Sequence, residues 1–162
     1  MEQEQDRALR EGFTLTGEIE LVVRGKDGHI KDVRCVKNLV VDAGLAAVAG
    51  LILTDVSVND FDYIAVGTGT VAPAAGDTAL GAEIVDSGLA RAAATGTRIT
   101  TTKTNDTAQL QLTFSVTGTK AVTEAGMFNA ASSGDMLARQ TFSAVNVVNG
   151  DSLTITWKIQ VS

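Results

Sequence analysis

The segment near the end of the chain has the most regular hydrophobic pattern in the sequence. Apolar and polar residues alternate strictly over residues 152–161. Successive side chains of a β-strand point to opposite faces of a sheet, so this alternation predicts a strand with one buried face. Burying an aliphatic or aromatic side chain contributes about 1.5–3 kcal/mol, while ordering each backbone residue costs about 1–2 kcal/mol. The strand therefore has to pair with distant strands, and its predicted core face comprises Leu153, Ile155, Trp157, Ile159 and Val161.

Shorter patterns of the same kind recur along the chain. Residues 14–24 and 29–37 flank the glycine-bearing turn 25–28, an arrangement that predicts a β-hairpin. Many short strands separated by turn residues are typical of a sandwich or barrel, so the sequence predicts an all-β fold. The remaining predicted strands cover residues 63–66, 96–103, 108–117, 122–129 and 135–142.

One segment has helical rather than strand periodicity. Within residues 41–53, apolar residues recur at the spacing of a helix face, and Asp42 is placed to cap the N-terminus. The small residues of this segment indicate close packing against a sheet. We also predict one helical turn over residues 77–83, within a long surface loop. The apolar stripe of the main helix comprises Leu45, Val48, Leu51 and Ile52.

The length of 162 residues suits one domain, which would bury roughly 68–70% of the surface of its unfolded chain. We assign this domain to residues 13–162 and an extended N-terminal arm to residues 1–12. The arm has few apolar residues, and a helix this short is marginal by itself, so we expect it to order only on a neighbouring molecule. A frayed terminus without a role is the alternative. The predicted partner-binding residues are Arg7, Leu9, Arg10 and Phe13.

Charge and cysteine content narrow the possible partners. The formal net charge of −6 repels nucleic acid and anionic membranes, and we expect neither as a direct partner. The chain has no run of 18 apolar residues, and its acidic start does not resemble a secretory signal. Cys35 is the single cysteine, which fits assembly in a reducing cytoplasm, and its expected position is a buried apolar site.

The sequence does not predict a catalytic or cofactor site. His29 is the only histidine and lies beside the hairpin turn, so we interpret it as a solvated turn residue rather than part of a catalytic triad. The glycine-rich segment 67–70 lacks the lysine and helix of a phosphate-binding loop. We also find no carboxylate pair that would suit a polysaccharide-cleaving enzyme. We therefore predict that the protein is not an enzyme and needs no cofactor.

Two sets of charged residues remain to be explained. Arg91, Arg98 and Arg139 are scattered over predicted strands, which favours individual ion pairs at a subunit contact. The segment 55–62 gathers oxygen ligands of the kind that Ca²⁺ prefers, although its spacing is not that of an EF-hand. A solvated acidic loop is the simpler interpretation of that segment. The weak calcium candidates are Asp55, Asp60 and Asp62, with Asn59 beside them.

Several segments, taken in order, resemble a family of small structural proteins of tailed-bacteriophage virions. The resemblance rests on their sequence and order, since each motif alone is weak. It covers about residues 38–161. The segments are Asn38–Leu45, Ile64–Thr70, Asp77–Glu83, Val122–Phe128, Met136–Arg139 and Gly150–Trp157.

The resemblance implies a place in the virion, reached after assembly in the host cytoplasm. We expect a jelly-roll-like β-sandwich with one short α-helix that forms a homotrimer and binds the major capsid protein. Such a capsid decoration, or cement, protein would stabilise the head exterior, with the arm clamping a neighbour. The alternative is a tail or fibre component, either an adaptor or a module that binds the host surface.

Overall fold

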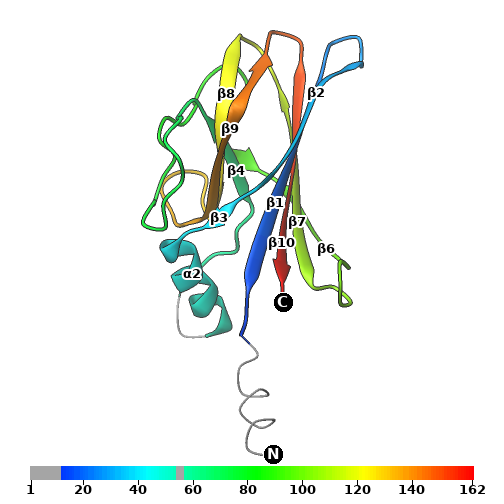
Figure 1. Ribbon diagram of the computed structural model, residues 1–162. Helices are drawn as coiled ribbons and strands as arrows, with labels where there is room; N and C mark the ends of the chain where they lie inside the picture. The colour runs from blue at the N-terminus through cyan, green and yellow to red at the C-terminus, as the bar shows by residue number, and fades with distance from the viewer. Residues whose placement is uncertain (1–11, 54–56) are drawn as a thin grey trace, which may run out of the picture.

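A computed structural model describes residues 12–53 and 57–162 and contains two five-stranded antiparallel sheets and, within these ranges, one helix (Figure 1). The first sheet has the strand order β2-β1-β10-β7-β6, and the second β3-β9-β8-β4-β5. The elements are β1 (Leu15–Arg24), β2 (Ile30–Lys37), β3 (Leu39–Val40), α2 (Asp42–Ile52), β4 (Tyr63–Gly67), β5 (Ala92–Ala93), β6 (Thr95–Ile99), β7 (Thr107–Ser115), β8 (Lys120–Phe128), β9 (Met136–Val147) and β10 (Ser152–Val161).

The two sheets enclose a shared hydrophobic core, which confirms the expected all-β sandwich. β10 lies in the middle of the first sheet between β1 and β7, and its alternating apolar residues are buried as predicted up to Ile159. Trp157 is fully buried, and its indole Nε1 donates a hydrogen bond of 2.8 Å to Asn38 Oδ1. Val161 is exposed, contrary to the prediction, because the strand ends there at an open end of the sandwich.

The first hairpin forms where the sequence predicts it. β1 and β2 pair antiparallel, and Gly28 closes the turn with a positive φ of 83° and a hydrogen bond to the Gly25 carbonyl. His29 is exposed beside Asp27, as expected of a turn residue. The expected burial of Cys35 is wrong: it pairs with Glu20 on the solvent face of the sheet, and the neighbouring Val36 points inward.

Other boundaries differ from the predicted ones. β6 ends at Ile99, because residues 100–106 form a turn organised by Asp106, which accepts hydrogen bonds from the amides of Thr101, Thr102 and Lys103. β9 continues to Val147, past the predicted end at residue 142. The two-residue strands β3 and β5 are too short to show an alternating pattern. No helix in the described ranges is long and apolar enough to cross a membrane.

The two predicted helical segments had different outcomes. α2 is present, but Val41 takes the N-cap position and no side chain caps the helix, so the expected cap at Asp42 is wrong. Residues 77–83 form an irregular segment with bends and an isolated β-bridge between Glu83 and Gly67, rather than a helix. In this loop the amides of Gly81 and Ala82 donate hydrogen bonds to the carboxylate of Glu124, which fixes the backbone in a non-helical path.

Candidate interaction surface

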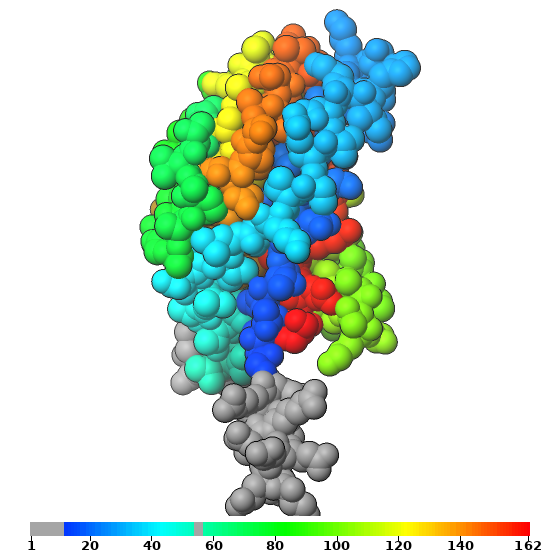
Figure 2. Space-filling view, viewed as in Figure 1, coloured from blue at the N-terminus to red at the C-terminus, as the bar shows by residue number. Residues whose placement is uncertain are grey.

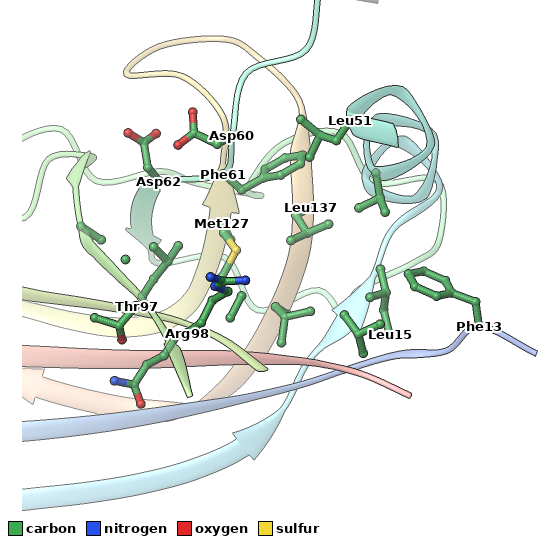
Figure 3. Close-up of a pocket in the computed structure, with 18 residues that line it drawn as sticks. Phe13, Leu15, Leu51, Asp60, Phe61, Asp62, Thr97, Arg98, Met127 and Leu137 are labelled. Atoms are coloured by element: carbon green, nitrogen blue, oxygen red, sulfur yellow. The ribbon is translucent and has the colours of Figure 1, made fainter. Parts of the chain in front are cut away.

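A groove of about 740 Å³ opens between the two sheets, at the end of the sandwich where β1 begins, and Figure 3 shows the side chains that line it. This end is the lower end of the ribbon in Figure 1. Its floor is apolar and is formed by residues from both sheets, namely Leu110 of β7, Met127 of β8 and Leu137 of β9. Phe61, in the segment before β4, and Leu51 of α2 form one wall (Figure 3). The groove therefore reaches the edge of the core, although these three floor residues are themselves at most 6% exposed.

The rim of the groove carries charged side chains on one side. Asp60 and Asp62 lie in the segment that enters β4, and Arg98 extends from β6 toward Met127 (Figure 3). None of these three charged residues forms an ion pair with another described residue. The groove thus combines an apolar floor with two carboxylates and one guanidinium that have no ion-pair partner among residues 12–53 and 57–162.

Helix α2 presents its large apolar side chains to the exterior next to this groove. Its buried residues are the small Gly44, Ala47 and Gly50, and Gly44 lies against Leu137 of β9. A Cβ atom at Gly44 would lie 2.3 Å from the Leu137 carbonyl oxygen, so only glycine allows this approach. The larger residues face outward, and Ile52 is 75% exposed. The exposed apolar residues of the helix and its C-terminal end are Leu45, Leu51, Ile52 and Leu53.

The groove and the outer face of α2 form one continuous apolar surface, because Val48 and Leu51 of the helix line the groove. Phe13, which is 64% exposed, extends this surface at the start of β1. In Figure 2 the cyan and teal atoms of α2 lie at the lower end of the molecule. Large exposed apolar patches mark interaction sites. We therefore take the groove and the outer face of α2 together as the candidate site and call them the lower apolar surface.

A buried ion pair holds the loops above this surface. Both oxygens of Glu124 accept hydrogen bonds, Oε1 from the amides of Gly69 and Ala82, and Oε2 from the amide of Gly81 and from Arg139. Burial alone raises the pKa of Glu124, but the hydrogen bonds from the amides and from Arg139 outweigh it and lower the pKa below the ordinary value of 4.5. The glycine-rich loop, which could resemble a phosphate site, thus binds an internal carboxylate.

The predicted arginines do not gather at one contact. Arg139 is buried and also bonds to Asp77 at 2.7 Å, so its ion pairs lie inside one chain rather than between subunits. Arg91 pairs with Glu83 at 2.7 Å and covers the Phe128 ring at 3.6 Å from its centroid. Arg98 is the member of the three whose side chain extends into the groove.

The other predicted site residues are only partly described. Arg7, Leu9, Arg10 and Asp55 lie outside the described residues. Phe13, Asp60 and Asp62 all line the groove. Within residues 12–53 and 57–162 no three histidine, cysteine or acidic side chains gather in a way that could hold a metal ion.

Sequence reasoning identified part of the lower apolar surface. The apolar stripe of the helix could be predicted from the sequence. Its outward orientation could not, because a stripe alone does not determine which face of the helix packs on the sheet. The groove was missed, since its floor comes from strands far apart in the chain. Glu124 was also missed, and its signal was an acidic residue at a position of β8 whose neighbours are all apolar or small.

Comparison with known proteins gives no relative for this arrangement. No protein-family model, no curated protein and no solved structure matches the chain.

Proposed function

We propose that the protein is a structural component of a tailed-bacteriophage virion. Specifically, it is a homotrimeric decoration protein with a jelly-roll-type sandwich that binds the major capsid protein on the outside of the head. The resemblance of residues 38–161 to virion proteins suggests the setting. The observation that carries the proposal is the lower apolar surface, an exposed hydrophobic end on an otherwise well-packed sandwich.

The proposed role requires no chemical step by the chain. A trimer offers three copies of each capsid-binding surface, and simultaneous binding raises the overall affinity without new kinds of contact. The trimer binds only the assembled shell and not the separate capsid subunits. Binding therefore shifts the equilibrium toward the assembled shell by mass action. Within each copy, the packed core and the hydrogen bonds from the loops to Glu124 hold the surface in a fixed shape.

The test uses heads of the encoding phage assembled without this chain. We expect purified protein to saturate such heads at their local three-fold positions and to raise the temperature at which the heads open. Absence of binding overturns the proposal. Few copies at a single vertex also overturn head decoration and indicate the tail or fibre component instead.

Matched variants connect the binding to the surface. Leu45→Ser/Ile52→Ser changes two exposed residues of α2, and Val148→Ser changes another exposed apolar residue, between β9 and β10. All three positions are solvent-exposed, so the fold should be retained in both variants, as circular dichroism checks. We expect loss of trimers and of head binding only for the α2 variant.

A further inference from the structure

The groove has the features of a receptor for an extended peptide. Its floor is apolar, and its rim has unpaired charges of both signs, namely the Asp60 and Asp62 carboxylates and the Arg98 guanidinium. A fitting segment would carry one apolar side chain between two basic ones, because the basic residues would pair with the two carboxylates.

The chain contains such a segment in its own arm. Arg7 and Arg10 flank Ala8 and Leu9, and acidic residues stand on both sides of this group, at Asp6 and Glu11. The arm thus offers two guanidiniums for the carboxylates, an apolar side chain for the floor and an acidic residue for Arg98. The two arginines are thus opposite in sign to the two carboxylates of the rim.

The described chain before β1 begins at the groove. Thr14 and Ser162 exchange two backbone hydrogen bonds, of 2.7 and 3.0 Å, so the antiparallel pairing of β1 with the C-terminal end holds up to Thr14. Phe13, the residue before this pairing, lines the groove. The point at which the arm joins the body is therefore at the lower apolar surface.

The size of the lower apolar surface favours a second copy as its partner. Beyond the groove it includes the outer face of α2, with Leu45 and Ile52. The arm has only Met1, Ala8 and Leu9 as apolar residues, which is too little to cover both parts. A second copy brings its own body as well as its arm. Eleven extended residues reach up to about 36–40 Å, enough to cross a subunit boundary.

We propose that residues 1–11 of one copy lie in the groove of a neighbouring copy, with Leu9 on the apolar floor and Arg7 and Arg10 paired with Asp60 and Asp62. In a trimer, each arm enters the groove of the next copy, so that three identical contacts form a closed ring. The inference deepens the proposed function by naming the partner of the lower apolar surface, and it rests on that function for the number of copies.

Engineered cysteines in the full chain test the arrangement directly. In a Cys35→Ser background, Leu9→Cys/Thr97→Cys places one thiol on the arm and one on the exposed wall of the groove. With oxidised glutathione as oxidant, we expect chains linked to one another on a non-reducing gel, up to covalent trimers. The control Leu9→Cys/Asp27→Cys, with its second thiol at the exposed hairpin tip, should stay unlinked.

Every outcome decides the proposal. A disulfide within single chains would place the arm in its own groove, and absence of a specific link would place it elsewhere; both overturn the exchange. Adding Asp60→Lys/Asp62→Lys should lower the yield of linked chains about tenfold or more, and Arg7→Glu/Arg10→Glu in the same chain should restore it. A yield insensitive to both changes overturns the assigned ion pairs.

Linking is measured without phage particles, which separates this inference from the proposed function. Chains that bind heads but do not link overturn the arm exchange alone. Chains that link but bind no head overturn the virion role and leave the exchange standing.

Discussion

At the scale of single residues, Glu124 shows how one buried charge organises distant parts of the chain. Its carboxylate is fully buried and accepts bonds from amides at positions 69, 81 and 82 and from Arg139. A buried charge is costly unless it is paired and its hydrogen bonds are satisfied. Here both oxygens are satisfied, so the loop over residues 67–83 is fixed on β8.

Glu124→Gln should destabilise the fold by about 3–5 kcal/mol, because it leaves Arg139 as a buried cation without its main partner. The amide cannot substitute, since both carboxylate oxygens face donors and either orientation of glutamine sets an NH₂ group against an N–H. Urea unfolding followed by tryptophan fluorescence measures the change. Asp27→Asn at the exposed hairpin tip is the control and should leave the midpoint unchanged; an equally small effect of Glu124→Gln would contradict the account.

Acid should also destabilise the protein. The Lys31 ammonium, 2.6 Å away, lowers the pKa of Asp151, and the hydrogen bonds described above lower that of Glu124. A carboxyl whose pKa is lower in the folded state contributes stability that is complete above its unfolded pKa and is lost as pH falls through the folded pKa. We expect the urea midpoint to be steady from about pH 7 to about pH 5 and to fall steeply below about pH 4. A midpoint that rises on acidification would contradict these shifts.

At the scale of elements, α2 is oriented by its small residues rather than by its large ones. Gly44 allows the helix to approach the backbone of β9, and this contact decides which face turns inward. The large apolar residues are then left outside. A hydrophobic stripe is normally taken as the core face of a helix. Here the stripe predicted the presence of the helix correctly but not its orientation. Only the small residues of the segment indicated which face packs on the sheet.

Gly44→Ala tests this orientation. In an ordinary helix the change would gain about 1 kcal/mol of helix propensity. Here the new methyl group would lie 2.3 Å from the Leu137 carbonyl oxygen, and overpacking of this kind costs about 1–3 kcal/mol or more, so we expect a lower melting temperature. Gly76→Ala, whose methyl group would meet no atom within 4 Å, should leave the melting temperature nearly unchanged. A Gly44→Ala variant as stable as the original would mean that α2 packs elsewhere.

The strands that could be predicted from the sequence are those with a clear local pattern. β10 and β1 could be predicted because alternation over about ten residues is a strong signal, and β2 because a glycine-bearing turn joins it to β1. β3 and β5 could not, since each exists only through pairing with a partner remote in sequence. The groove belongs to the same class, because its floor is set by the spacing of two sheets and not by any local pattern.

The outer strand of the first sheet is an unsuitable place for self-association. Asp32 and Arg34 of β2 share the inward face with Val36 and form an ion pair of 3.1 Å. Inward charges on an edge strand hinder pairing with a strand of another molecule. The free edges of the second sheet are β3 and β5, of two residues each. Contacts between copies are therefore not expected at the β2, β3 and β5 edges, which leaves the end of the sandwich and the β6 edge of the first sheet.

At the scale of the whole molecule, the features suited to association lie at one end. The groove, the outer face of α2, the start of β1 and the end of β10 all lie at the lower end in Figure 1. Exposed apolar patches mark interaction sites, and we propose that other copies of the chain cover this end, with the arm as a second contact between them.

The molar mass of the intact chain in solution tests this account most directly. Light scattering over a range of concentrations should give three times the 16.8 kDa of the single chain, and Leu45→Ser/Ile52→Ser should return it to 16.8 kDa without loss of secondary structure. A folded chain that stays at 16.8 kDa at every concentration, before and after these substitutions, would contradict the claim that copies of this protein cover its lower apolar surface.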